Sequence, residues 1–118
     1  MAITLQNEYG TITVEDEVIA KLAGLTAMEC YGIVGMAAKN VKEGIFRLLK
    51  KESLTKGIML NTENNKVSLD FHIIVEYGTN IPAIAENAIS AVRYKLEESL
   101  NIEAEEINVF VEGIRIDV

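Results

Sequence analysis

The clearest pattern along the chain is a strict alternation of apolar and polar residues between positions 67 and 77. The apolar set is Val67, Leu69, Phe71, Ile73, Val75 and Tyr77. The intervening set is Ser68, Asp70, His72, Ile74 and Glu76. Successive side chains of a strand point to opposite faces, so this period of two predicts a long strand. One face should be buried, and the other should be wet or covered by a partner.

Other segments predict further strands around this one. Residues 57–61 precede a turn at 63–66, where Asn64 and Asn65 tolerate positive φ angles, so residues 57–77 form a hairpin. In residues 105–118 the apolar positions are Ile107, Val109 and Val111 on one side, with Asn108, Phe110 and Glu112 on the other. Residues 10–14 predict a short first strand, and residues 32–36 an extended turn that packs inward.

Apolar residues at helical spacing predict two long helices and one short helix. The first runs from about 14 to 30, with Thr13 as its N-cap and Asp16 three residues later. The second spans 81–100, and Pro82 fits its first turn because no amide donor is needed there. A short amphipathic helix is expected at roughly 42–51.

The predicted order is therefore β-α-(short α)-β-β-α-β. Helices on one face of a mixed or antiparallel sheet give an α+β fold, a two-layer sandwich. A length of 118 residues suits a single domain over 1–118.

Charge is unevenly distributed along this acidic chain, which has 11 Lys and Arg, 18 Asp and Glu, and a net charge of −7. Residues 39–56 carry six cations and two anions, a net +4, while the remainder carries −11. The basic residues of the short helix expected at 42–51 are Lys42, Arg47, Lys50 and Lys51. This helix has three interpretations: it packs on the core, docks on an acidic protein partner such as another copy, or lies on anionic lipid.

Catalytic and metal-binding chemistry is not indicated. His72 is the only histidine in the sequence. Asp70 and Ser68 are expected on the same strand face as His72, and the side chains of Asp70 and His72 could form a hydrogen bond. Ser68, Asp70 and His72, at successive positions on one face of a strand, do not readily form both an aligned catalytic triad and an oxyanion hole. Cys30 is a lone cysteine, expected as a small core residue. No catalytic, cofactor-binding or metal-binding residue is predicted, and no cofactor is expected.

A KH-like nucleic-acid loop is a weaker alternative. Residues 32–35 match the pattern GxxG, but the central positions Ile33 and Val34 are apolar rather than basic. The acidic composition also disfavours phosphate binding. The chain has neither a basic, apolar N-terminal segment nor an apolar run of the ~20 residues needed to span a membrane, so a cytoplasmic protein is expected.

Five short motifs in order resemble one known family. They are Gly10-x-Ile12-x-Val14, then Glu29-x-x-Gly32-Ile33-Val34-Gly35, then Gly57-Ile58, then Val75-x-Tyr77-Gly78-x-x-Ile81, and finally Val109-x-Val111-x-Gly113-Ile114. Together they resemble the alkaline shock protein family of bacterial envelope stress response proteins, particularly its shorter housekeeping branch. Cys30-Tyr31 departs from the pattern of many members. The resemblance covers nearly the whole chain and implies that the motif glycines are determinants of the fold.

The resemblance implies interaction rather than catalysis. It points to a non-enzymatic interaction or scaffold protein in envelope stress response or homeostasis, either cytoplasmic or peripheral to the inner face of the membrane. Self-association as a homo-oligomer and a membrane anchor protein as partner are both implied. The alternative is a regulatory partner of a lipid-metabolism enzyme, fatty acid kinase or acetyl-CoA carboxylase. The expected contact residues are those of the basic helix, together with Asp70, His72, Ile74 and Glu76.

Overall fold

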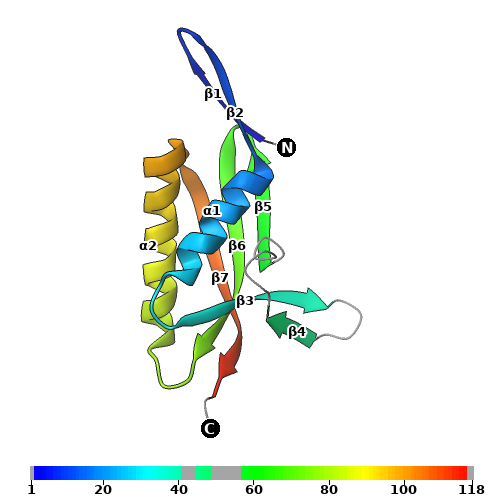
Figure 1. The fold of residues 1–118 in the computed structure, drawn as a ribbon, viewed down its shortest axis with the longest axis vertical. Coiled ribbons are helices and arrows are strands. Elements are labelled where there is room, and N and C mark those ends of the chain that lie inside the picture. The colour runs from blue at the N-terminus through cyan, green and yellow to red at the C-terminus, as the bar shows by residue number, and fades with distance from the viewer. Residues whose placement is uncertain (1, 41–44, 49–56, 117–118) are drawn as a thin grey trace.

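The computed structural model describes residues 2–40, 45–48 and 57–116. Two helices and seven strands lie within these residues (Figure 1). In chain order they are β1 (Ala2–Asn7), β2 (Gly10–Glu15), α1 (Asp16–Met28), β3 (Ile33–Asn40), β4 (Ile45–Leu48), β5 (Ile58–Glu63), β6 (Lys66–Glu76), α2 (Ile81–Leu100) and β7 (Ala104–Arg115). The predicted α+β class is confirmed.

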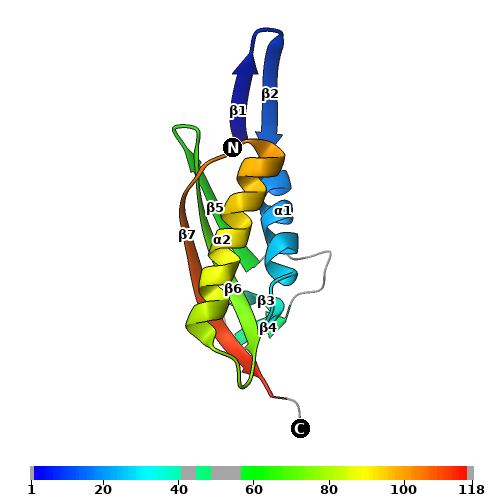
Figure 2. The same cartoon turned by 90° about the vertical axis from the view of Figure 1, so that its left-hand side faces the viewer.

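Strand β6 is the centre of a mixed sheet. Along one edge it pairs antiparallel with β5 through its first half and with β3 through its second half. Along the other edge β7 runs parallel to it, and α2 makes the crossover connection between them. Helices α1 and α2 pack on one side of this sheet (Figure 2). The predicted two-layer arrangement with helices on one face is therefore present.

The helix predicted at 42–51 is wrong where the structure describes this segment, because residues 45–48 form strand β4. They pair antiparallel with the second half of β3, from Ala37 opposite Leu48 to Asn40 opposite Ile45. A short apolar run fits both helical and strand periods, and pairing with a neighbouring strand decides between them. The rest of the predicted helix, 41–44 and 49–51, lies outside the described residues.

The segment before β4 also differs from expectation. The extended turn predicted at 32–36 is the start of β3, whose residues Ile33 and Met36 are buried against the core. Ile33 and Val34, which lie between two glycines, therefore belong to the eight-residue strand β3 and not to a turn. Its pairing with β6 shifts register between Ile33 and Gly35.

The predicted first helix is present but shorter than expected. Helix α1 begins at Asp16 after Glu15, which makes no side-chain capping hydrogen bond, so the prediction of Thr13 as N-cap is wrong. Thr13 instead lies in β2, where it pairs with Thr4 of β1. Strand β1 was not predicted from the sequence. Its backbone pairing with β2 holds residues 10–15 extended, so the helix begins at Asp16 instead of near residue 14.

Helix α2 matches its predicted bounds of 81–100. The side chain of Asn80 caps it by accepting a hydrogen bond from the Ala83 amide at 3.1 Å, and Pro82 lies in the first turn. The helix ends at Asn101, whose left-handed φ of 55° allows the chain to turn towards β7.

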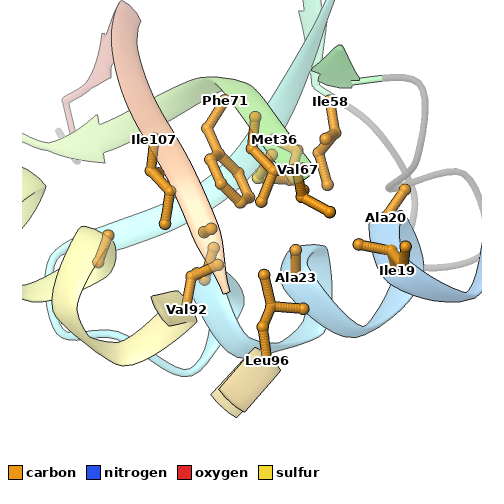
Figure 3. Close-up of a cluster of buried hydrophobic side chains, with 14 of the residues drawn as sticks. Ile19, Ala20, Ala23, Met36, Ile58, Val67, Phe71, Val92, Leu96 and Ile107 are labelled. Atoms are coloured by element: carbon orange, nitrogen blue, oxygen red, sulfur yellow. The ribbon is translucent and has the colours of Figure 1, made fainter. Parts of the chain in front are cut away.

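The core fills the space between the helices and the inner face of the sheet (Figure 3). Residues Val67 and Phe71 of β6 point towards Ala23 of α1 and towards Val92 and Leu96 of α2. All five residues are at most 2% exposed. The predicted inner set of β6 is therefore buried, except that Tyr77, beyond the end of the strand, is 68% exposed.

Cys30 follows α1 and is half-buried, with its thiol donating to the carbonyl oxygen of Thr26 at 3.5 Å. Burial raises the pKa of the Cys30 thiol, and the neighbouring Glu29 carboxylate raises that pKa further. Thiolate is the reactive form, so at pH 8 we expect Ellman's reagent to modify the folded protein several-fold more slowly than the urea-unfolded chain. Equal rates in the two states would contradict this placement.

Candidate interaction surface on the open side of the sheet

The outer side of the sheet carries the polar half of the β6 alternation. No helix in the described part of the chain packs on this side (Figure 2). Strand β7 contributes the matching residues beside β6. We call this surface the open sheet face and define it as Asp70, His72, Ile74 and Glu76 of β6 with Asn108, Phe110 and Glu112 of β7.

Parallel pairing of β6 with β7 brings the first members of the open sheet face together. Asp70 lies opposite Asn108, and the amide Nδ2 of Asn108 donates to Oδ1 of Asp70 at 2.9 Å. Both side chains are partly buried. The hydrogen bond fixes the Asp70 carboxylate in one orientation, with oxygen lone pairs left to accept further donors.

His72 is held from two sides at the middle of the open sheet face. Its Nδ1 lies 2.8 Å from Oε1 of Glu112, and both side chains are largely shielded, at 22% and 17% exposure. The imidazole also stacks on Phe110, with ring centroids 5.1 Å apart and planes 15° from parallel. These contacts together fix the imidazole orientation.

A bulge in β7 explains why Glu112 reaches His72. Ile73 pairs with Val111, but the next residue of β6, Ile74, pairs with Gly113, so Glu112 is the extra residue. Bulges redirect side chains and commonly involve glycine. The alternation of residues 105–118 predicts Glu112 on the outer face, but it does not predict the pairing of Glu112 with His72. Gly113 within an apolar strand was the available signal.

Apolar groups stay exposed around this fixed polar network. Phe110 is 45% exposed, and Met59, opposite Asp70 on β5, is 63% exposed. Ile74 is half-buried, and its neighbour Gly113 places no side chain over it. Oriented hydrogen-bonding groups beside exposed apolar groups are the combination that protein interfaces use.

The outer end of the open sheet face carries a weak ion pair. Arg115 Nη2 lies 3.7 Å from Glu76 Oε1, and both side chains are almost half-exposed. Exposed pairs of this kind contribute little to stability. Both groups therefore remain suited to contacts with a partner.

The local hydrogen bonds differ from the Asp70–His72 pair that the sequence spacing allowed. Asp70 bonds to Asn108, and His72 bonds to Glu112. Ser68 occupies the same strand face, but no contact connects it to His72 as a base. The arrangement is suited to binding, and among the described residues it does not place a nucleophile beside an activating group.

The basic half of the predicted surface is only partly covered by the structure. Arg47 lies in strand β4, while Lys42, Lys50 and Lys51 lie outside the described residues. The expectation that these four cations contact a partner stays a prediction. Of the two predicted contact regions, the structure assembles the strand face.

The GxxG segment does not form an exposed loop. Ile33 begins strand β3 and is 7% exposed, and Gly35 is buried opposite Ile74. A loop that clamps a nucleic-acid backbone must present its amides to solvent. The geometry at residues 32–35 is therefore that of a paired strand.

Comparison with known families gives a match that covers residues 4–116. The matching model describes the alkaline shock protein 23 family, with a cell envelope-related function. This chain belongs to that family. The alkaline shock resemblance is confirmed, and the family is described by a cell envelope-related function.

Curated relatives of this alkaline shock family chain include an uncharacterised protein, YloU, from Bacillus subtilis. It is 39% identical over 117 residues, covering 98% of each chain. A stress response regulator gls24 homolog from Streptococcus pyogenes serotype M3 is 28% identical over 109 residues, covering 90% of this chain and 59% of that protein. No solved structure gives a significant match.

A helix that spans a bilayer needs about 20 predominantly apolar residues. Within the described residues of this alkaline shock family chain, neither helix combines the length and the apolar character needed to cross a membrane.

Proposed function

We propose that this alkaline shock family chain is a non-enzymatic interaction protein of the envelope stress response or envelope homeostasis. It binds a protein partner through the open sheet face, in the cytoplasm near the inner face of the membrane, and it self-associates. The observation that carries the proposal is a sheet face whose polar side chains are already oriented while its apolar groups remain exposed.

Pre-orientation lowers the cost of binding at this face. Ordering a free side chain in an interface costs about 0.5–1.5 kcal/mol, and His72 and Asp70 are already ordered by Glu112 and Asn108. Phe110 supplies an aromatic group near the centre of the face, and aromatic residues are common interface hot spots. Burying the exposed apolar side chains of Phe110 and Met59 against a partner makes a favourable hydrophobic contribution to the binding free energy.

The charges of the open sheet face define the partner's chemistry. Three carboxylates, those of Asp70, Glu76 and Glu112, surround the apolar groups. The complementary surface therefore carries apolar side chains flanked by Lys or Arg. A membrane anchor protein and a lipid-metabolism enzyme are the two partner classes that this proposal includes.

The non-enzymatic part of the proposal is supported by the engagement of the only histidine. His72 contacts a carboxylate and an aromatic ring, and neither is a nucleophile that a general base could activate. The family description points the same way, because it names an envelope-related function.

Complementation of a deletion strain under envelope stress tests the function. Phe110→Glu places a charge at the centre of the open sheet face, and Tyr94→Glu makes the same type of change at a residue of α2 that is 66% exposed. We expect wild type and Tyr94→Glu to restore growth on a cell-wall antibiotic, and Phe110→Glu to fail at equal protein levels. Full restoration by Phe110→Glu would contradict the role of this face.

A further inference from the structure

Strands β1 and β2 form a separate two-stranded sheet that projects beyond one end of the body (Figures 1 and 2). Its inner end is anchored by Ile3 and Val14, which pair with each other and are 1% and 9% exposed. Two residue pairs further out, Leu5 and Ile12 continue the same apolar face, and Ile12 is 51% exposed. We call residues 2–15 the arm.

The outer edge of β1 is closed by a side chain from the body. Asn65 accepts a hydrogen bond from the Thr4 amide and donates one to the Thr4 carbonyl, each at 2.9 Å. Unpaired strand edges are sites of pairing with other chains, and covering them prevents such pairing. Asn65 protects the β1 edge at its centre in this way.

The outer edge of β2 is left open. Because the backbone groups of Thr4 point away from β2, those of its partner Thr13 point away from β1. The same alternation directs the backbone groups of Thr11 outwards. Among the described strands, only β1 pairs with β2, so the amides and carbonyls of Thr11 and Thr13 face away from the arm.

We propose that the β2 edge is a self-association site, at which β2 of a second copy pairs antiparallel, centred on Ile12, to form a four-stranded sheet. The proposal deepens, and rests on, the self-association included in the proposed function. It uses a surface separate from the open sheet face.

The backbone pattern of β2 fits a twofold pairing of this kind. Antiparallel pairing centred on Ile12 places Thr11 of each copy opposite Thr13 of the other, which aligns the two residues with outward backbone groups. Ile12 then lies opposite Ile12 as a non-hydrogen-bonded pair, in which side chains approach most closely. A surface that pairs with itself is what a twofold dimer requires, so a second copy is the favoured occupant.

Side chains on both faces of the arm support the same register. The apolar face gains a row in which Leu5 and Ile12 of one copy continue into Ile12 and Leu5 of the other. The opposite face pairs threonines, which are favourable cross-strand neighbours.

Stability and charge also favour pairing of two arms. A two-stranded sheet is marginal in water, and additional strands stabilise it. The central residues Thr11, Ile12 and Thr13 are uncharged, so the ladder brings no like charges together. The two acidic bodies lie at opposite ends of the joined sheet because the strands are antiparallel.

Proline at position 13 tests the proposal. Thr13→Pro removes an amide that faces away from β1, so the hairpin bonds of the arm are retained while the edge loses a donor. Thr13→Val is the matched control, since it keeps the amide and the β-branched shape. By sedimentation we expect wild type and Thr13→Val to form dimers or larger species, and Thr13→Pro to show half their mass.

Two sedimentation results would overturn the proposal: a monomeric wild type, or a Thr13→Pro variant with wild-type mass. Phe110→Glu separates this proposal from the proposed function. We expect it to keep the wild-type mass while failing in complementation. If Phe110→Glu reduces the mass and Thr13→Pro does not, self-association uses the open sheet face and the arm proposal is wrong.

Disulfide cross-linking tests the register independently and applies even if Thr13→Pro does not fold. In a Cys30→Ser background, Ile12→Cys places two thiols at a directly opposed pair, within the ~4.4–6.8 Å between Cα atoms that a disulfide needs. Thr13→Cys is the control. In the proposed register Thr13 lies directly opposite Thr11 of the second copy, so the two Thr13 residues are only diagonal neighbours and are further apart than the two Ile12 residues. We expect oxidised dimers from Ile12→Cys alone. Equal cross-linking at both positions, or none at position 12, would overturn the register.

Discussion

Phe71→Ala is expected to lower the free energy of unfolding by about 3–5 kcal/mol, the range for removing a large buried aromatic side chain. Phe71 is 2% exposed and extends from the inner face of β6 towards the two helices. The matched change Phe110→Ala, on the open sheet face, is expected to cost about 1 kcal/mol, because Phe110 is 45% exposed and loses mainly its stacking on His72. Urea denaturation of the two variants measures this difference.

The comparison depends on equal slopes of the two unfolding transitions. If the slope m is unchanged, the shift in midpoint reports stability alone. Similar losses in the two variants would mean that the outer face of the sheet is covered as fully as the inner face. That result would contradict an open sheet face.

Gly32→Ala is expected to destabilise the protein by about 2–4 kcal/mol, combining backbone strain with overpacking. Gly32 has a φ of +88°, which L residues rarely adopt. A Cβ at this position would also overlap Cδ1 of Ile84 and lie 2.7 Å from its Cγ1. Ile84 is only 3% exposed, so it has little room to move.

Gly78→Ala is the matched control for the steric part of this effect. Gly78 has the same φ of +88°, but a Cβ there would meet no atom within 4 Å. Gly78→Ala should therefore lower the free energy of unfolding by only about 1 kcal/mol, from backbone strain alone. Ile84→Val removes the overlapping methyl group and should partly rescue Gly32→Ala in a double-mutant cycle by urea denaturation. Equal costs at both glycines would show that the contact with Ile84 is unimportant.

Much of this fold was predictable where one period is long and uninterrupted. The alternation along β6 correctly separated Phe71 from His72, because a long strand with one buried face leaves little freedom of register. Helix α2 was predictable from its apolar residues at helical spacing and from Pro82 in its first turn. Both segments carry their own local signals.

The errors lie where pairing with a distant strand decides the local structure. Residues 45–48 fit a helical stripe, yet β3 supplies a partner and makes them a strand. Thr13 resembles an N-cap, but its pairing with Thr4 keeps it extended. Short segments carry too few residues for periodicity to separate these states.

The candidate site was half predictable for the same reason. The outer residues of β6 follow from alternation, but their partners depend on which strand lies beside β6 and in what register. Parallel pairing with β7 and the bulge at Glu112 replace the local Asp70–His72 contact with two contacts across strands. Neither the register nor the bulge follows from the spacing of Asp70 and His72.

The most direct measurement of partner binding is affinity capture of three tagged chains at native expression: wild type, Phe110→Glu and Tyr94→Glu. Each chain is captured from detergent-solubilised cells and its partners are quantified by mass spectrometry. We expect one protein to be recovered in stoichiometric amounts with wild type and Tyr94→Glu, and to be lost with Phe110→Glu. Recovery of the same protein in equal amounts with Phe110→Glu would show that the open sheet face is not the binding surface.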